Sequence, residues 1–531
     1  MKEKRKLKLK KFYIHPITVF IVLPLLIVLL SAILSGFEMQ ATYNTVNATS
    51  KELETTIVAV ENLLSFDGMK FIISNAATNF ISFAPLVTLL ISLIGLSIAE
   101  ATGFIEAFSR KYIRKLSPMQ ITFLVIFLGT ISSLINEIGY AILIPLVAMI
   151  YASNGRNPLT GIVTAFCGVT FGYAVSLFVG SMEVSLMDYT ASAAALIDEN
   201  THISLTSNLI FSIVASIILS IIGTIIIEKI ISPKLGKYKE REDMLKTEEL
   251  RIIDLQEEEQ KKIEREKNQK RGLLFSLISF IIVVMAFIYM VIPGLPNSGM
   301  LLDMNEVTYL GQVFGPNSYF QDGFTYMMSL LFLFLGLAYG FGARSIKNDK
   351  ELLEKAGKTF SKAGSIIILM FVMAQFIAIF KKTNIAVIIT AWLANLIEYL
   401  EFSGIPLIVL TLILIAVSNL FLTTPAAKWA IFSPVVVPMF MQSNISPQFA
   451  QLVMRVGDSM TNGITPLLGC FAIYIGYLNI YNFDLSKPIT IRRSINLILP
   501  YFGIIFATWL LLVVGWYIIG LPIGPRVYPT I

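Results

Sequence analysis

Long apolar stretches alternate with short polar segments along all 531 residues of the chain. A helix needs about 20 apolar residues to cross a bilayer, and seven stretches approach or reach that length without interruption. Three more apolar regions are interrupted by glycine, proline or polar residues. We therefore predict an all-α polytopic membrane protein, with the first stretch retained because no signal-peptide cleavage pattern follows it. The uninterrupted stretches are 14–35, 78–104, 205–231, 273–295, 324–342, 364–381 and 494–519, and the interrupted regions are 118–151, 158–190 and 404–480.

The composition agrees with this class. The chain is 55% hydrophobic and 14% charged, with a mean hydropathy of +0.74, whereas a soluble domain is about 25% charged. A soluble enzyme, a disordered chain and a disulfide-rich secreted protein are excluded. Two Cys and two His are too few for zinc, haem or an iron–sulfur cluster. We therefore expect no cofactor and, without a nucleophile–histidine–acid set, no enzyme activity.

Lysine and arginine are concentrated on one side of the predicted membrane. The tail 1–13 carries seven of them, and 110–115, 344–362 and 487–493 carry many more. Taking the basic side as cytoplasmic puts the N-terminus inside the cell and the tail 520–531 outside, in a multi-pass protein of the cell membrane. The net charge of +6 is then an orientation signal, and we expect a lipid bilayer rather than nucleic acid as partner.

This orientation makes two of the interrupted regions re-entrant hairpins. Both ends of 118–151 fall inside and both ends of 404–441 fall outside, so each region enters the membrane and turns back. Non-helical backbone at membrane depth persists only when it is buried in protein or lines a cavity. Each hairpin tip is therefore a candidate site, one in a first half (14–231) and one in a second half (273–519).

The segment 232–272 joins the two halves. It holds 12 basic and 11 acidic residues, so we predict a solvated cytoplasmic helix, with a partner-binding role as the alternative. The segments 37–75 and 296–322 are predicted to be outer loops.

The two halves also match each other at an offset of 289 positions. Because the charges give the two copies opposite orientation, we predict an inverted repeat, an architecture of secondary transporters that bind substrate near the midplane. The pairs in register include Tyr140 with Trp429, Pro145 with Pro434, Pro158 with Pro447, and Gly168 with Gly457.

The strongest polar cluster lies at 455–466 within an apolar region. Arg455 and Asp458 are three residues apart, so on a helix they share a face and can pair. Gly457, Gly463 and Pro466 favour unwinding, which frees backbone carbonyls. The cluster suits a hard cation such as Na⁺, and Arg455 suits a substrate carboxylate; the alternative is a buried pair that only fixes helix packing. The predicted ion ligands here are Asp458, Ser459, Asn462 and Thr465.

The tip of the second hairpin, 423–429, combines hydroxyls, a proline and small residues, which suit a tight turn with free N–H groups. We count Thr424, Lys428 and Trp429 as candidate substrate contacts. Trp429 would stack on an aromatic substrate or, equally, pack in the core. Lys428 would contact substrate or extend its ammonium to the surface.

The first half offers polar residues at the corresponding depth. Asn136 and Glu137 lie at the tip of the first hairpin, and Ser176 and Glu183 lie in the broken span beyond it. We predict all four as ion-binding residues, because an intramembrane carboxylate can bind a cation or carry a proton. The alternative for Glu183 is a solvated position near the outer surface. Glu100 is interpreted as a structural carboxylate.

Six stretches of the chain are distinctive: VENLLS (60–65), NFISFAPL (79–86), AKWA (427–430), PMFM (438–441), GDSMTN (457–462) and GLPIGP (520–525). Together they resemble the p-aminobenzoyl-glutamate transporter (AbgT) family over nearly the whole chain. The resemblance implies a homodimer whose protomers have nine crossing helices and two hairpins. It implies transport of p-aminobenzoyl-glutamate, a folate breakdown product, or export of sulfonamide-like antimetabolites, coupled to Na⁺ or H⁺.

The resemblance carries functional positions onto this chain. These positions, which we count as substrate-binding candidates, are Trp429, Pro447, Arg455, Asp458 and Pro466. Four positions depart from the usual pattern. Ala426 replaces a serine and Ser176 an asparagine, while Glu183 and Glu137 each replace an aspartate. The second-half site is thus typical of the family, and the first-half site is not.

The sequence therefore favours an ion-coupled secondary transporter in which the hairpins move against a dimer scaffold, as in an elevator. Within transport, the alternative is an exporter of antimetabolites or a carrier of another carboxylate. A channel or a membrane receptor is the alternative from a different class. A carrier saturates and counter-exchanges labelled substrate, and a channel does neither.

Overall fold

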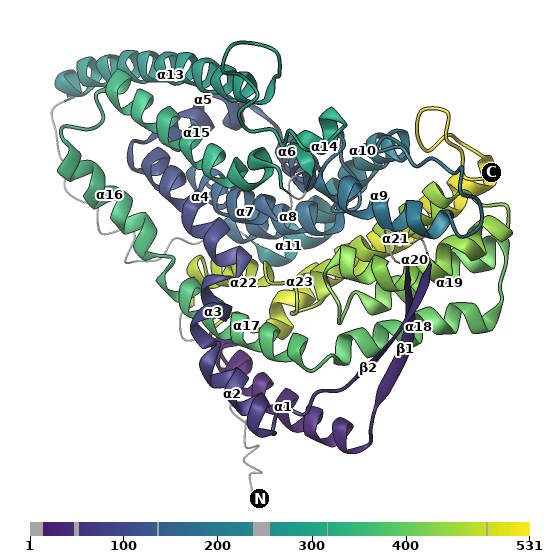
Figure 1. Cartoon of the computed structure of the whole chain (residues 1–531). Helices are drawn as coiled ribbons and strands as arrows, with labels where there is room; N and C mark the ends of the chain where they lie inside the picture. Colours follow the sequence, from purple (N-terminus) through teal and green to yellow (C-terminus); the bar gives the residue numbers. More distant parts are fainter. Residues whose placement is uncertain (1–13, 47–51, 135–136, 237–254, 316, 485–486) are drawn as a thin grey trace, which may run out of the picture.

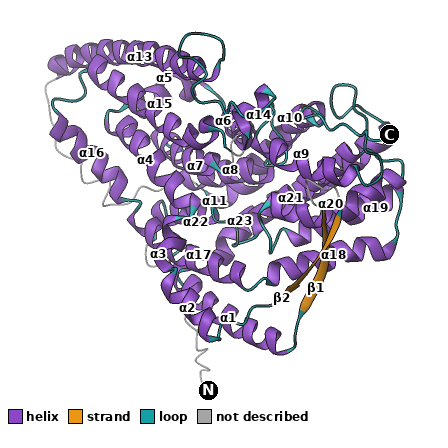
Figure 2. Cartoon of the chain, viewed as in Figure 1, coloured by secondary structure: helices purple, strands orange, loops and turns teal. Residues whose placement is uncertain are grey.

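Helices make up nearly all the regular structure of the chain (Figures 1 and 2). The computed structural model describes residues 14–46, 52–134, 137–236, 255–315, 317–484 and 487–531. Among these residues, seven helices are long and apolar enough to cross a bilayer. Each overlaps one of the seven predicted stretches, so the prediction of an all-α polytopic membrane protein is confirmed. They are α1 (Pro16–Gly36), α4 (Ala84–Ala101), α10 (Leu209–Ile226), α13 (Leu255–Val291), α15 (Tyr319–Ala343), α17 (Gly364–Lys382) and α23 (Ile491–Ile519).

The first interrupted region folds as two helices joined at a tip. α6 (Pro118–Ile131) begins with a capping box, in which Ser117 and Gln120 satisfy each other's backbone N–H groups. The chain bends by 120° between α5 (Phe104–Tyr112), extended by η1 (Ile113–Lys115), and this helix. After η2 (Ser132–Leu134) the second arm of the hairpin, α7 (Ile138–Ser153), runs back.

The first part of the interrupted region 404–480 also folds as two helices joined at a tip. α19 (Gly404–Ser418) and α20 (Pro425–Gln442) form the arms, and residues 419–424 form the tip. A broken helical region follows each hairpin in the chain. After the first hairpin it is α8 (Pro158–Phe171) and α9 (Ser181–Ala194), and after the second it is α21 (Pro447–Thr461), η4 (Asn462–Ile464) and α22 (Phe471–Ile480).

Contacts recur at the same offset of 289 residues. The Ser459 hydroxyl donates to the Thr170 carbonyl at 3.4 Å, so two residues separated by the offset touch each other. Gly168 packs against Ile126, and its offset counterpart Gly457 packs against Ile415. These contacts involve positions that the predicted repeat places in register.

The structure differs from the sequence expectations in three segments. The segment 37–75, predicted only to be an outer loop, contains regular structure, because β1 (Gln40–Val46) and β2 (Leu53–Ala59) pair antiparallel and β1 lies against α18 and α20. The apolar helix α18 (Ile385–Leu400) was not expected at all. α13 runs without a break from the charged segment 232–272 into the next span, so no boundary falls at residue 273. The remaining elements are α2 (Phe66–Ser74), α3 (Ala76–Ile81), η3 (Ile227–Ile231), α11 (Ser232–Leu235), α14 (Tyr309–Phe314) and α16 (Asp349–Ser361).

Candidate functional site

A polar cavity of about 450 Å³ lies where the two hairpin tips meet. Glu137 reaches it from the first tip, Thr424 from the second, and Asn462 from η4 between α21 and α22. Thr88 on α4 and Asp322 on α15 line the remaining side. Its volume is in the range of small-molecule sites, about 300–1,000 Å³. The fold therefore brings residues far apart in sequence, from both predicted tips, to one cavity.

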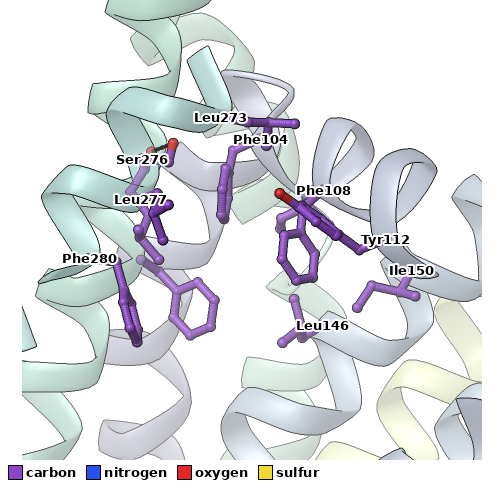
Figure 3. A pocket seen from close by; sticks show the side chains of 12 residues that line it. Phe104, Phe108, Tyr112, Leu146, Ile150, Leu273, Ser276, Leu277 and Phe280 are labelled. Atoms are coloured by element: carbon purple, nitrogen blue, oxygen red, sulfur yellow. Dashed lines mark hydrogen bonds between the residues drawn. The ribbon is translucent and has the colours of Figure 1, made fainter. Parts of the chain in front are cut away.

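A second cavity of about 470 Å³ lies among α5, α7, α13 and α15 and is nearly all apolar (Figure 3). Apart from the Tyr112 hydroxyl and Ser276, its lining is aromatic and aliphatic. The Ser276 hydroxyl already donates to the Leu335 carbonyl at 2.9 Å. This cavity offers little to a charged solute, so the polar cavity is the candidate substrate site.

Two helices begin at the polar cavity. α7 starts at Ile138 and α20 starts at Pro425, and both residues line it. Neither N-cap residue, Glu137 or Thr424, caps its helix through its side chain. The N-terminus of a helix carries a partial positive charge and unpaired N–H groups, so it attracts anions. The two hairpins thus direct two such ends toward one space.

Carboxylates supply the charged side chains of this cavity. Glu137 and Asp322 line it, and its described lining includes no Lys or Arg. The Cys470 thiol donates to Glu137 Oε2 at 3.1 Å, which holds this carboxylate in place. A cation beside the carboxylates and an anion at the helix ends are both favoured by this arrangement.

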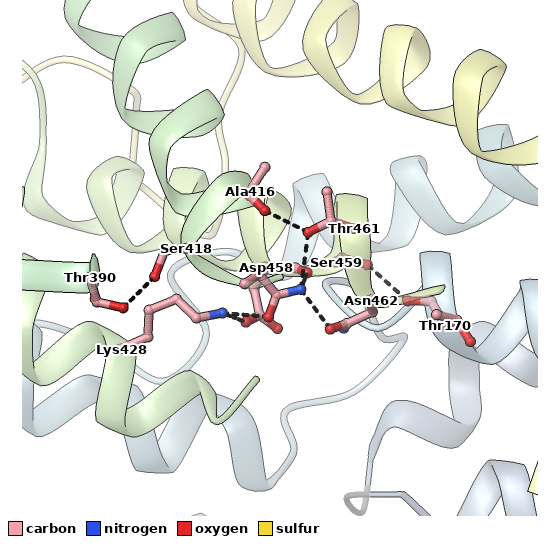
Figure 4. A network of polar contacts seen from close by, with 10 residues as sticks. Thr170, Thr390, Ala416, Ser418, Lys428, Asp458, Ser459, Thr461 and Asn462 are labelled. Carbon is pink, nitrogen blue, oxygen red and sulfur yellow. Dashed lines mark hydrogen bonds and ion pairs between the residues drawn. The ribbon is translucent and has the colours of Figure 1, made fainter. Parts of the chain in front are cut away.

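Behind the cavity, Lys428 and Asp458 form an ion pair with fully buried side chains (Figure 4). Lys428 Nζ also donates to Asn419 Oδ1 at 2.6 Å. The Asn419 amide in turn donates to the Asp458 carbonyl at 2.6 Å and to Asn462 Oδ1 at 2.8 Å. The interpretation of Lys428 as a residue that extends to the surface is wrong, because this network encloses its ammonium.

Arg455 pairs with Glu183 on α9, at 2.6 Å between Nη2 and Oε1. The predicted pairing of Arg455 with Asp458 is wrong, because each finds its partner on another element. Glu183 is buried, so its alternative placement at the solvated surface is also wrong. Its second oxygen accepts the Gly180 N–H at 2.9 Å. Arg455 Nε and Nη1 have no hydrogen-bond partner in the described part of the chain.

Trp429 lies in the core rather than in the cavity. Its ring is fully buried, and its Nε1–H donates to the Thr190 hydroxyl at 2.9 Å. That hydroxyl also contacts Gln451 Oε1 on α21 at 3.0 Å. The geometry therefore supports packing, the second of the two roles considered for Trp429.

Other predicted residues have structural partners. Pro447 opens the first turn of α21, and half-buried Pro466 follows η4. The Thr465 hydroxyl donates to the Leu420 carbonyl at 2.8 Å, and Ser176 accepts the Phe178 N–H at 3.3 Å. Gly457 does not unwind its helix, since α21 continues to Thr461. Asn136 lies outside the described residues.

Sequence reasoning missed some residues of this region. Asn419 connects the Lys428–Asp458 pair to η4, and its signal was a polar Ser-Asn step in the apolar run of α19. Asp322 falls in a segment predicted to be an outer loop, which gave no indication that it would face the tips. In the sequence, Thr88 is like any other threonine within a membrane-spanning stretch. No local signal therefore identifies it as a cavity residue.

The family model described as "AbgT putative transporter family" matches residues 10–531. The chain belongs to this family. It is 30% identical over 517 residues to the p-aminobenzoyl-glutamate transport protein of Escherichia coli, covering 97% of this chain and 94% of that protein. The resemblance inferred from the sequence stretches is confirmed, and the chain is an AbgT-family transporter with several membrane-spanning helices.

Two solved AbgT-family structures are also similar. The YdaH transporter of Alcanivorax borkumensis is 28% identical, with a TM-score of 0.47, over 96% of this chain and 100% of that one. MtrF of Neisseria gonorrhoeae, described as illuminating a class of antimetabolite efflux pumps, is 30% identical, with a TM-score of 0.48, over 97% and 98%.

Proposed function

We propose that this chain is an ion-coupled secondary transporter of p-aminobenzoyl-glutamate or a closely related aromatic carboxylate. The substrate would occupy the polar cavity between the two hairpin tips. A relative that it matches along nearly its whole length is a p-aminobenzoyl-glutamate transport protein, which supports the substrate class.

The observation that carries the proposal is the convergence of both tips on one cavity. The N-termini of α7 and α20 suit the two carboxylates of a glutamyl group. Glu137 and Asp322 suit a cation that would accompany the substrate. A dianion and its coupling cation thus find complementary groups in one space.

The transport cycle follows as a proposal from the same arrangement. We propose that the hairpins and the broken helices after them move together against a scaffold of spanning helices in a homodimer. Either Na⁺ or H⁺ would drive the movement. Arg455 is buried here, so it would bind substrate only in a conformation that exposes the unpaired Nε and Nη1 of its guanidinium.

A flux measurement tests the function. Purified protein in liposomes is given labelled p-aminobenzoyl-glutamate or a labelled sulfonamide, with Na⁺ and H⁺ gradients imposed separately. We expect saturable transport of the glutamate conjugate that one gradient accelerates, together with counter-exchange. Unsaturable flux would indicate a channel, and binding without flux would indicate a receptor.

A matched pair of variants tests the location of the substrate. The hydroxyls of Thr88 and Thr508 each donate to the carbonyl four residues earlier at 2.9 Å, but only Thr88 lines the cavity. Thr88→Phe should fill the space and raise KM at least about tenfold, roughly 1.4 kcal/mol of binding. Thr508→Phe should leave KM unchanged. Equal effects of the two variants would place the substrate elsewhere.

A further inference from the structure

The ammonium of Lys428 occupies a position surrounded by oxygen ligands. It pairs with Asp458 Oδ1 and donates to Asn419 Oδ1 at 2.6 Å, and both Lys428 and Asp458 are inaccessible to solvent. A carboxylate and an amide carbonyl are the ligands that hard cations use in proteins. Figure 4 shows the Lys428 side chain extending from α20 toward Asp458 on α21.

The surrounding hydrogen bonds fix the direction of the Asn419 amide oxygen. The Asn419 amide nitrogen donates to the Asp458 carbonyl and to Asn462 Oδ1, so the Asn419 oxygen must face Lys428. The Thr461 hydroxyl is also committed, because it donates to the Ala416 carbonyl at 2.8 Å. The site is therefore organised around a positive charge that the protein itself supplies.

A second cation does not fit beside this ammonium. Like charges repel strongly in a buried, low-dielectric environment, and Asp458 supplies the only negative charge known to contact Lys428 among the described residues. An unpaired buried charge is costly, so the lysine and the aspartate neutralise each other. The prediction from the sequence that Asp458 binds Na⁺ therefore does not agree with the structure, in which the Lys428 ammonium already contacts this carboxylate.

The repeat gives an independent indication that the two charges belong together. At the offset of 289, the counterparts of Lys428, Asp458 and Asn419 are Gly139, Val169 and Thr130. The first half thus lacks both charges, although Ser459 and Thr170 show that the two halves meet at this depth. The ammonium and the carboxylate are present as a unit in one half and absent as a unit in the other.

We propose that the Lys428 ammonium is the resident cation of the Asp458 site and excludes Na⁺ from it. Asp458 is then not a ligand of the coupling ion in this transporter. Any coupling cation binds elsewhere, and the cavity carboxylates Glu137 and Asp322 are the available groups. This inference deepens the proposed transport function. It rests on that function only in assuming that transport is coupled to an ion.

The test removes the ammonium and asks whether Na⁺ takes its place. Purified Lys428→Ala is melted in NaCl and in choline chloride of equal concentration. A ligand that binds only the folded state raises the melting temperature. We expect Na⁺ to raise the melting temperature of Lys428→Ala by about 2 °C or more beyond the shift that Na⁺ causes in the unchanged protein. No added Na⁺ response in a folded Lys428→Ala protein would overturn the proposal.

Three further variants make the outcome specific. Lys382→Ala removes a lysine that pairs with Glu61 at 2.7 Å but lies 40% exposed, and it should gain no Na⁺ response. Adding Asp458→Asn to Lys428→Ala should abolish the gain. If Lys428→Ala does not fold, the Na⁺-dependent shift in the melting temperature of Asp458→Asn tests the proposal instead. A shift as large as that of the unchanged protein supports the proposal, because Asp458 then does not bind Na⁺. A shift that is lost in Asp458→Asn overturns it. Because no substrate is used, failure here is distinct from failure of the flux experiment.

Discussion

At the scale of single residues, the buried charges are paired across elements rather than along one helix. Arg455 and Asp458 share α21, yet Arg455 pairs with Glu183 of α9, and Asp458 pairs with Lys428 of α20. A buried pair is neutral as a unit, but removal of one member leaves the other charge without compensation. Each pair therefore ties α21 to a different neighbour.

The Arg455–Glu183 pair gives a prediction at this scale. Glu183→Gln removes the carboxylate and leaves the guanidinium buried, so unfolding in detergent should become easier by about 3–5 kcal/mol. Glu61→Gln is the matched control, because its pair with Lys382 is exposed and an exposed pair contributes about 1 kcal/mol or less. Melting temperatures of both variants check the difference. A loss for Glu183→Gln no larger than that of the control would contradict the pairing.

At the scale of elements, glycines set the distance between the first hairpin and the broken helix that follows it. A Cβ on Gly129 of α6 would lie 2.6 Å from the carbonyl carbon of Gly168 on α8. A Cβ on Gly168 would lie 2.9 Å from the Ile126 backbone. Backbone atoms cannot move aside as a side chain can, so this approach requires glycine on both helices.

Gly129→Ala should therefore separate α6 from α8 and disturb the hairpin tip. We expect a loss of about 1–3 kcal/mol in stability and a higher KM for transport, because Glu137 lies at that tip. Gly503→Ala on α23 is the control, since no atom beyond its own stretch of helix backbone lies within 4 Å of its added Cβ and alanine favours a helix by up to about 1 kcal/mol. Thermal unfolding and flux of both proteins test this. Equal stability of the two variants would refute the close packing.

At the scale of the whole molecule, the charge distribution and the fold can be combined into an orientation. The helix α16 carries part of the basic segment 344–362, and the loop after α9 carries no lysine or arginine up to α10. Positive residues remain on the cytoplasmic side of membrane proteins. We predict that α16 is cytoplasmic and that the α9–α10 loop lies outside.

Cysteine labelling checks this orientation. The chain has two cysteines, Cys167 and Cys470, both free and buried, so replacing both with serine gives an unreactive background. Asn200→Cys and Lys355→Cys are then introduced separately at exposed positions. An impermeant maleimide should label intact cells through Asn200→Cys, and through Lys355→Cys only after permeabilisation. The reverse pattern would invert the topology.

The helices of this protein could be predicted from local sequence more reliably than the contacts within its site. The seven continuous spans and the breaks after Phe171 and Thr461 follow from apolar length and from glycine and proline positions. The helical spacing of Arg455 and Asp458 predicted a shared face correctly but a partnership wrongly. Spacing along one helix says which side chains are neighbours there, and it carries no information about charges brought by other helices.

The sequence by itself determined the membrane class, the spanning helices, the three interrupted regions and the charges that needed an explanation at membrane depth. These properties depend on transfer of each segment from water to an apolar phase, which is a local quantity. Only the tertiary structure decided that Lys428 neutralises Asp458, that Trp429 is a core residue, and that Glu137, Asp322 and Thr424 share one cavity. Those outcomes depend on which helices pack together across hundreds of residues, and packing is a property of the whole chain.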